Sequence, residues 1–209
     1  MNRIDIIKKL INKFGYRSYL EIGVRGGDCF KNISIDSKEA IDPDPKCEID
    51  KRINVMTSDV FFENLSVDKK YDIVFIDGLH EHFQVLKDVQ NSLNHLSENG
   101  VIVLHDCNPP SSWNQREPSE YDGTGAWNGT VWKAFVEYRS KRKDLNMFVV
   151  DCDWGVGIIQ KTQKKDFLEY VCNVEDDITS YNWLNKNRKM ALNLISPEDF
   201  QKWINGVSG

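Results

Sequence analysis

Apolar residues in this chain form short continuous runs that alternate with segments of helical spacing. The runs 71–76 and 100–104 are the strongest, and each predicts a buried strand. Between them lies an apolar stripe of helical period, at Val85, Leu86, Val89, Leu93 and Leu96. Asn99-Gly100 predicts the end of that helix. The central part of the chain is therefore expected to fold as strand, helix and parallel strand.

Weaker runs on either side continue the same alternation. Further strands are predicted at 19–22, 53–56, 147–150 and 155–159, and another short strand is predicted to end at 41–42. Further helices are predicted at 4–14, from 131 onward and after 196. This order predicts an α/β fold, a doubly wound and mostly parallel sheet with a final antiparallel hairpin. We expect a single domain over 1–209, with a core at about 17–160 and a helical extension at about 164–209.

One long segment, 108–128, has no period and is rich in polar residues, Pro, Ser and Gly. A loop of this length in a compact domain is usually a functional lid or a disordered segment. It contains Trp113, Tyr121 and Trp127, and disordered segments are poor in aromatic residues. The composition therefore favours a lid.

Composition excludes several classes of function. The 209 residues carry 27 basic and 32 acidic side chains, and the net charge of -5 argues against a nucleic-acid-binding surface. The basic run 139–143 ends a predicted helix and is expected to be a solvated face. No apolar run reaches membrane-spanning length, and the first ten residues lack the layout of a secretion signal. Five cysteines without a C-x-x-C pair predict a reducing cytoplasm and no zinc site. A homo-oligomer is compatible with this composition.

Acidic and imidazole side chains follow the two strong strands directly. Asp77 and His80 come after the first strand, and His105 and Asp106 come after the second. In an open α/β sheet, ligands bind at the carboxyl ends of the strands. All four histidines lie between positions 80 and 105, three of them beside these strand ends. We expect the chemistry of the protein at this edge.

The turn after the first predicted strand indicates the kind of ligand. Gly23, Gly26 and Gly27 allow a close approach of the backbone, and Asp42, which ends the second strand, can accept the hydroxyls of a ribose. Arg25 stands where the dinucleotide fingerprint needs its second glycine. The nearby acids Glu21 and Asp28 would repel a pyrophosphate. These residues favour a nucleoside with a cationic centre, such as S-adenosylmethionine, over a nicotinamide dinucleotide.

Five segments together resemble a known family. They are Tyr19-Leu-Glu-Ile-Gly-Val-Arg-Gly-Gly27, Ile41-Asp-Pro43, Thr57-Ser-Asp59, Phe75-Ile-Asp-Gly-Leu-His80 and Val103-Leu-His-Asp106. This ordered set is similar to class I S-adenosylmethionine-dependent methyltransferases, and most similar to the small-molecule branch that includes the macrolide-sugar O-methyltransferases. The resemblance covers about 17–160 and implies a Rossmann-like methyltransferase fold.

The resemblance also implies roles for individual residues in binding the cofactor. Glu21, Gly23 and Gly27 would line the methionine part, and Asp42 would hold the ribose. Ser58 and Asp59 would line the adenine, while Asp77 would border both the cofactor and the reacting end. The methyl acceptor implied by this branch is a small, polar, sugar-like molecule, and the expected reaction is O-methylation.

The reacting end needs a way to remove a proton from a weakly acidic hydroxyl. A base can accept the proton, and a bound cation can lower the pKa of the hydroxyl. Asp77 and Asp106 are the hard oxygen ligands that Mg²⁺ prefers, with His105 as a third candidate ligand. In the resembling sugar O-methyltransferases, Asp-x-x-His supplies a metal ligand and the general base, which assigns the base to His80.

This chain departs from the resembling enzymes at two positions. His105 replaces the first of two adjacent acidic ligands, and imidazole binds Mn²⁺, Fe²⁺ or Zn²⁺ better than Mg²⁺. Cys107 stands where the catechol-type enzymes have an asparagine ligand. Both the identity of the metal and the need for one therefore stay open at this point.

Other interpretations of the same residues also stay open. Asp77 can cap the following helix, His105 can be a hydrogen-bonded core histidine, and His82 is expected to face solvent. For Trp127 and Asn128, packing and capping are as good an explanation as substrate contact. The whole chain could also be a binding module for S-adenosylmethionine without turnover, or a metal-dependent hydrolase on the same fold.

Overall fold

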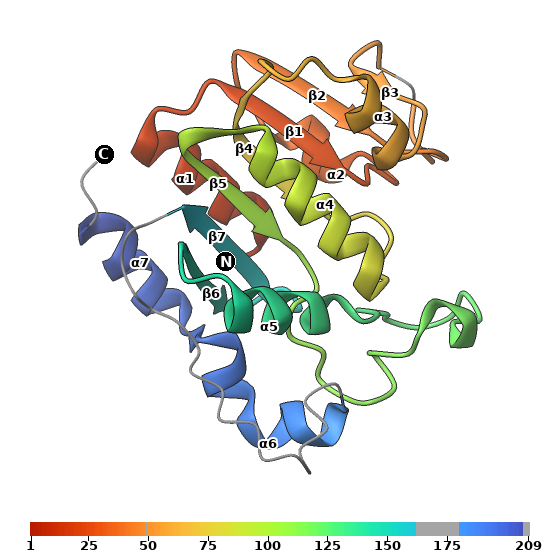
Figure 1. Cartoon of the computed structure of the whole chain (residues 1–209), viewed down its shortest axis with the longest axis vertical. Helices are drawn as coiled ribbons and strands as arrows, with labels where there is room; N and C mark the ends of the chain where they lie inside the picture. Colours follow the sequence, from red (N-terminus) through yellow and green to blue (C-terminus); the bar gives the residue numbers. More distant parts are fainter. Residues whose placement is uncertain (49, 162–179, 207–209) are drawn as a thin grey trace.

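The computed structural model describes residues 1–48, 50–161 and 180–206. In this part of the chain, a mixed sheet carries helices on both faces (Figure 1). Its strands are β1 (Ser18–Ile22), β2 (Ser37–Ile41), β3 (Ile53–Asn54), β4 (Tyr71–Ile76), β5 (Leu96–Leu104), β6 (Leu145–Val150), β7 (Val156–Lys161) and β8 (Leu194–Ile195). Its helices are α1 (Arg3–Phe14), α2 (Asp28–Asn32), α3 (Ser58–Asn64), α4 (His82–Asn94), α5 (Val131–Lys141), α6 (Tyr181–Leu192) and α7 (Pro197–Gly206).

The strand order confirms the predicted fold class. The sheet runs β3-β2-β1-β4-β5-β7-β6-β8, and all neighbouring pairs from β3 to β5 are parallel. Strand β7 is antiparallel to both β5 and β6, so the predicted final hairpin is also confirmed. Because β1 to β5 are parallel, their carboxyl ends meet at one edge, where the acidic strand ends lie.

Alternating side chains of the central strands pack into two separate core layers. On one face, Val74 and Ile76 pack with residues of α4 and α5, which lie in front of the sheet in Figure 1. On the other face, Ile73 and Phe75 pack with residues of α1 and α7. Burial on both faces explains why the 71–76 run is almost continuously apolar.

The predicted boundary between α4 and β5 is wrong. Helix α4 ends at Asn94, Leu96 already belongs to β5, and Asn99-Gly100 lies inside that strand. A Cβ on Gly100 would lie 2.9 Å from the carbonyl oxygen of Asp72, close to the register irregularity between β4 and β5. The glycine therefore permits a close approach of two strands and does not end a helix.

Two polar side chains expected at the surface are largely covered. Arg139 is 5% exposed, and its Nη1 donates to the carbonyl oxygens of Met190 and Ala191 at 2.7 and 2.8 Å. It therefore caps the last turn of α6, which sequence periodicity on α5 alone could not indicate. The Nε2 atom of His82 lies 2.8 Å from Oε2 of Glu137, between α4 and α5.

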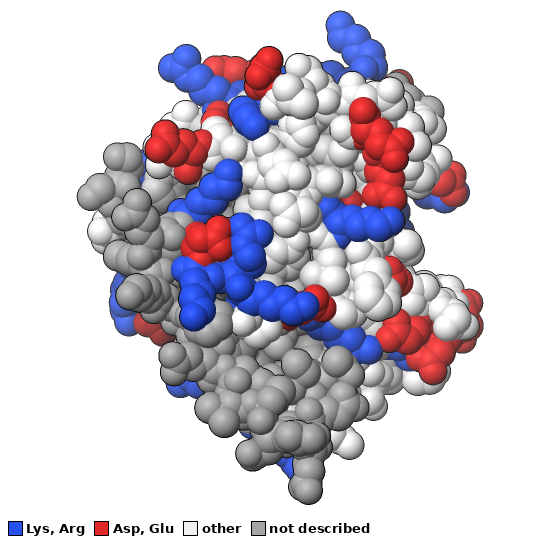
Figure 2. Space-filling view, in the orientation of Figure 1, with Lys and Arg blue, Asp and Glu red and all other residues white. Residues whose placement is uncertain are grey.

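No described helix combines the length and the apolar composition that crossing a bilayer requires. Figure 2 shows several basic side chains gathered left of the centre of this face, near α5, with acidic side chains beside and between them.

Candidate active site

The turn after β1 can be formed only with glycine at position 23. Gly23 has φ of 89°, and a Cβ there would lie 2.2 Å from the carbonyl oxygen of Asp77. Asp42 holds the same turn, because its Oδ2 accepts the amides of Val24 and Arg25 at 2.8 and 2.7 Å. Three strands, β1, β2 and β4, are thus joined at their carboxyl ends.

Glu21 lies beneath this turn and is 1% exposed. The hydroxyl of Tyr19 donates to its Oε2 at 2.5 Å. Burial raises the pKa of Glu21 to about 8, against the lowering effect of the hydrogen bond from Tyr19. Gly27, at φ of 79°, packs against Cys47 at the start of α2. Glu21 therefore supports the turn from the interior of the protein.

Ser58 and Asp59 begin α3 and are joined to α4. The hydroxyl of Ser58 donates to Oδ1 of Asp88 at 2.6 Å. The carboxylate of Asp59 accepts from Gln84 and pairs with Lys87, both at 3.1 Å. The structure therefore places both residues at the carboxyl edge beyond β3.

Three residues that follow β4 and β5 converge at this edge. Ligand atoms of Asp77, His80 and Asp106 all lie within 4.8 Å of one another. His80 stands between the two acids, with Nε2 3.2 Å from Oδ1 of Asp77 and Nδ1 3.4 Å from Oδ2 of Asp106. Helix α4 is capped by Glu81 and not by Asp77, so the capping alternative does not explain Asp77.

His105 contacts the same two acids but is enclosed on its other side. Its Nδ1 lies 3.2 Å from Asp77 and 3.0 Å from Asp106, and its Nε2 lies 2.8 Å from the carbonyl oxygen of Asp153. The guanidinium of Arg3 contacts both ring nitrogens. The ring nitrogens of His105 therefore already face partners within the protein.

The charges at this edge stabilise one another. Burial alone would lower the pKa of His105, but the charge of Asp77 and hydrogen bonds to Asp106 and Asp153 raise it. Burial alone would raise the pKa of Asp77, but the charge of His105 holds it below its usual range. The pKa of His80 is also raised, because its hydrogen bond to Asp77 and the charge of Asp106 outweigh burial.

Backbone strain is concentrated at the same edge. Among the described non-glycine residues, positive φ occurs at Arg25 (44°), Asp106 (60°), Asp153 (46°), Trp154 (66°) and Asn193 (45°). Only the last of these lies away from the edge, as the C-cap of α6. Strained residues of this kind persist where the surrounding structure holds them, often at functional sites.

Sequence reasoning missed two residues of this edge. Arg3 comes from the start of α1, and its amide donates to Oδ2 of Asp153 at 2.9 Å, while its Nη1 lies 3.8 Å from Oδ2 of Asp77. Asp153 lies in the tight turn between β6 and β7. The acidic turn 151–155 is a signal that could have indicated Asp153, but no local pattern links Arg3 to residues that lie far away in the sequence.

The segment before α5 packs closely on His80. The ring of Trp127 stacks on His80 with centroids 5.1 Å apart, and Tyr121 stacks on Trp127 at 4.4 Å. A Cβ on Gly129 would lie 2.1 Å from the carbonyl oxygen of His80, which accepts the amide of Thr130 at 2.8 Å. Two of the three loop aromatics thus pack on the site, whereas Trp113 is 59% exposed.

Comparison with protein families agrees with this geometry. Residues 20–107 match the model of a family described as a methyltransferase domain. The match covers 88 of the 209 residues, and this central part of the chain is therefore similar to methyltransferase domains. The matched range begins in β1 and ends just after Asp106, so it contains the carboxyl ends of β1 to β5 but not the turn of Asp153. A search of curated proteins finds no match to the chain.

Several solved structures share the fold of this chain. Cofactor-bound Rv0187 from MTB is 13% identical with a TM-score of 0.57, over 78% of this chain and 82% of that chain. The O-methyltransferase TomG from Streptomyces achromogenes, involved in tomaymycin synthesis and solved with SAM, is 15% identical with a TM-score of 0.53, over 75% and 78%. SAH-bound PaMTH1 from Podospora anserina is 13% identical with a TM-score of 0.50, over 78% and 80%.

The residues at the carboxyl edge fit a bound nucleoside. Asp42 already accepts three backbone amides, those of Val24, Arg25 and Asp44. A carboxylate offers about four acceptor positions, so about one is left for a ribose hydroxyl. The turn of Gly23 leaves no room for a side chain, and Asp77 adds a negative charge beside it.

The residues also fit a divalent cation. Two carboxylates and an imidazole at mutual ligand distance form a common donor set for such ions. A buried oxygen nearby, Oδ1 of Asn128, has no hydrogen-bond partner in the described part of the chain. The amide of the same side chain donates to Asp106 at 2.7 Å.

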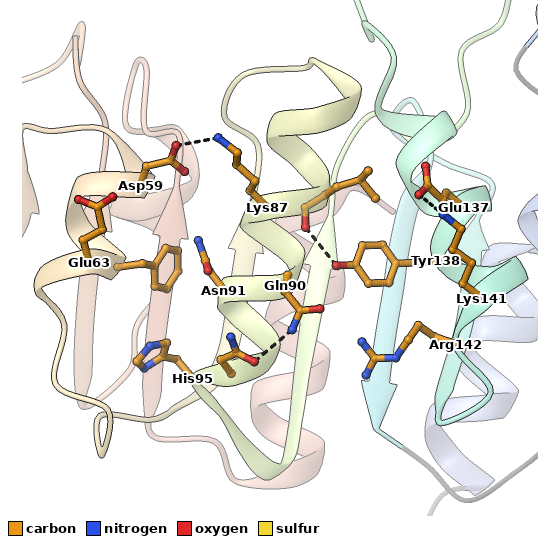
Figure 3. Close-up of a pocket in the computed structure, with 13 residues that line it drawn as sticks. Asp59, Glu63, Lys87, Gln90, Asn91, His95, Glu137, Tyr138, Lys141 and Arg142 are labelled. Atoms are coloured by element: carbon orange, nitrogen blue, oxygen red, sulfur yellow. Dashed lines mark hydrogen bonds and ion pairs between the residues drawn. The ribbon is translucent and has the colours of Figure 1, made fainter.

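Two hollows lie at or near the carboxyl edge of the sheet. The smaller, of about 390 Å³, is lined by Asn108, Pro110, Asp151, Cys152, Asp153, Trp154, Gly155, Asn185 and Arg188. It shares Asp153 with the surroundings of His105. The larger, of about 830 Å³, is a groove between α3, α4 and α5 (Figure 3). Asp59, paired with Lys87, reaches it, but Tyr138 and Arg142 place most of it along the helices and away from the strand ends.

Proposed function

We propose that this protein is a class I S-adenosylmethionine-dependent methyltransferase that transfers a methyl group to a hydroxyl of a small, polar, sugar-like acceptor. The observation that carries the proposal is the position of His80 between Asp77 and Asp106, at the edge where the glycine turn ends. A cytoplasmic location is part of the proposal and is supported by the cysteine usage.

The cofactor-binding residues would act from three strand ends. The turn of Gly23 and Gly27 would receive the methionine part, with Glu21 supporting it from below. Asp42 would accept a ribose hydroxyl, and Ser58 and Asp59 would border the adenine. When bound, the cofactor supplies a methyl group on a positively charged sulfur.

His80 would accept the proton of the acceptor hydroxyl. The hydroxyl oxygen then forms its bond to the methyl carbon, and the carbon–sulfur bond breaks with its electrons going to sulfur. Asp77 holds Nε2 of His80 at 3.2 Å and would stabilise the imidazolium that forms. The stacked ring of Trp127 fixes the plane of the imidazole.

A divalent cation held by Asp77 and Asp106 would assist the transfer. When bound, the ion lowers the pKa of a coordinated hydroxyl. His105 contacts both carboxylates and would orient them, as the partners of metal ligands commonly do. The chemistry of the donor set supports this part of the proposal.

The smaller hollow is the best candidate for the acceptor. Its volume of about 390 Å³ lies within the usual range for small-molecule sites. Trp154 is 43% exposed and offers an aromatic surface, while Asn108, Asn185 and Arg188 offer hydrogen-bonding groups. This combination suits a polar molecule with several hydroxyls.

The proposal can be tested with the methyl-labelled cofactor and fractionated polar small molecules from a cell extract. We expect label in a polar, acid-stable O-methylated product, formed by the wild-type chain and not by His80→Ala. Binding of S-adenosylhomocysteine without transfer to any fraction would favour a binding module. Tight Mn²⁺ binding without binding of S-adenosylhomocysteine would favour a hydrolase.

A further inference from the structure

The proposed cation at Asp77 and Asp106 lacks an obvious third protein oxygen. The nitrogens of His105 face Asp77, Asp106, Asp153 and Arg3. Cys107 is fully buried, and its Sγ lies 3.4 Å from the carbonyl oxygen of Leu104. The following inference rests on the cation part of the proposed function and concerns the residue that completes the site.

Asn128 is fully buried beside Asp106 and uses only half of its amide. Its Nδ2 donates to Oδ1 of Asp106 at 2.7 Å and lies 3.5 Å from the carbonyl oxygen of Trp154. Its Oδ1 has no hydrogen-bond partner within the described residues. A buried acceptor without a hydrogen-bond partner is costly, so a bound group that fills this position would be stabilised.

The backbone around Asn128 fixes the amide in place. Its own amide donates to the carbonyl oxygen of Asn114 at 2.8 Å, and the amide of Thr130 donates to that of His80 at 2.8 Å. Gly129, at φ of 59°, leaves no space between this segment and His80. The side chain therefore reaches Asp106 from a segment that is already attached to the site.

We propose that Oδ1 of Asn128 is the third oxygen ligand of a divalent cation bound by Asp77 and Asp106. Amide oxygens are common ligands of hard divalent cations. The amide of Asn128 would then supply the oxygen ligand that the side chain of Cys107, directly after Asp106, cannot supply. The bond from Nδ2 also occupies Oδ1 of Asp106 and leaves Oδ2 facing His80 and His105.

Mn²⁺ titration of the full, metal-stripped chain tests this assignment, with free Mn²⁺ followed by electron paramagnetic resonance. All titrations contain saturating S-adenosylhomocysteine, and its affinity is measured separately. We expect Asn128→Ala to weaken Mn²⁺ binding about 10- to 100-fold, the usual effect of losing a partner at a metal site. Asn128→Asp keeps an oxygen and adds a charge, so it should bind Mn²⁺ at least as tightly as the wild type.

Thr124→Ala is the control, because Thr124 lies in the same loop and its hydroxyl bonds only to Asp122 among the described residues. It should leave Mn²⁺ affinity unchanged. Equal losses in Asn128→Ala and Asn128→Asp would show that only the Nδ2 donor matters and would overturn the ligand assignment. Mn²⁺ affinity at the wild-type value in Asn128→Ala would also overturn the ligand assignment. A wild-type chain that binds S-adenosylhomocysteine but no Mn²⁺ would overturn this inference and the cation part of the function, and would leave methyl transfer standing.

Discussion

The two halves of the carboxyl edge are built in different ways. In the nucleoside half, formed by the ends of β1 and β2, backbone amides surround Asp42, and glycines make the turn. In the reacting half, formed by the ends of β4 and β5 and the turn between β6 and β7, side chains from distant segments surround Asp77 and Asp106.

The acids of the two halves also ionise differently. Glu21 on β1 and Asp77 after β4 lie on paired strands, since Glu21 is in register with Phe75. Burial raises the pKa of Glu21 to about 8, whereas the charge of His105 keeps that of Asp77 low despite burial. Charge in the reacting half is therefore compensated within the protein. The comparison teaches that the first half depends on backbone shape and the second on the pairing of side chains.

The largest effect is expected in the reacting half, at His80. His80→Ala removes the proposed proton acceptor and should lower turnover about 10²- to 10⁴-fold. Affinity for S-adenosylhomocysteine should stay at the wild-type value, because the nucleoside half is built separately. Both quantities can be measured, by label transfer and by calorimetry.

His82→Ala is the control for this prediction, since His82 pairs with Glu137 and not with the strand-end acids. Turnover close to that of the wild type is expected for it. Mn²⁺ titration of His80→Ala adds a second readout. A large loss of Mn²⁺ affinity would make His80 a metal ligand and would contradict its role as the base.

A smaller effect, on stability, is expected from Gly23→Ala in the nucleoside half. The new Cβ would lie 2.2 Å from the carbonyl oxygen of Asp77, at φ of 89°. Backbone strain and overpacking together should lower the free energy of unfolding by about 3 kcal/mol. Urea unfolding measures it. Gly15→Ala, also at positive φ but with no atom within 4 Å, should cost only about 1 kcal/mol. Equal losses of unfolding free energy in Gly23→Ala and Gly15→Ala would show that the close approach of Gly23 to Asp77 does not matter for stability.

This difference between the halves explains what the sequence could predict. Gly23, Asp42 and the ends of β4 and β5 follow from local patterns, because a strand that ends in a turn places its next residues at the edge. Local patterns also gave the helix at 4–14, which the structure has as Arg3–Phe14. These features depend on short stretches of chain.

Features that depend on contacts between distant segments could not be predicted from the sequence. Arg3 and Asp153 lie 150 residues apart in the sequence and both meet His105, and Asn128 meets Asp106 from the long loop. The wrong boundary at Leu96 has a similar cause, since Gly100 serves the packing of β5 on β4. Tertiary contacts decide such positions, and one-dimensional periodicity does not contain them.

A third prediction tests whether Asp42 still contacts the ligand although backbone amides occupy most of its acceptor positions. Asp42→Ala should weaken affinity for S-adenosylhomocysteine by roughly 1.5–3 kcal/mol, the scale of a hydrogen bond to a charged group. Isothermal titration calorimetry measures it. Asp44→Ala removes an exposed neighbour that pairs with Lys46 and should leave the affinity unchanged. If Asp42→Ala binds S-adenosylhomocysteine as tightly as Asp44→Ala does, Asp42 only holds the backbone of the turn and does not contact the ligand.

The smallest effect concerns the pH dependence of stability and comes from Glu21. Its pKa is about 8 in the folded protein and near 4.5 in the unfolded chain, so between these values the folded state keeps a proton that the unfolded state has lost. The raised pKa of Glu21 therefore contributes to the free energy of unfolding in full below about pH 4.5, and this contribution is lost as the pH rises through 8. In Glu21→Gln this loss of stability with rising pH cannot occur, because the amide does not ionise and can still accept a hydrogen bond from the hydroxyl of Tyr19.

We expect the fall in unfolding free energy from pH 5 to pH 8 to be about 1–3 kcal/mol smaller in Glu21→Gln than in the wild type, as measured by urea unfolding. Glu39→Gln, at a partly exposed position paired with Lys69, should leave the wild-type slope in place. An unchanged slope in Glu21→Gln would mean that this acid is already ionised at pH 5, and the contrast between Glu21 and Asp77 would then disappear.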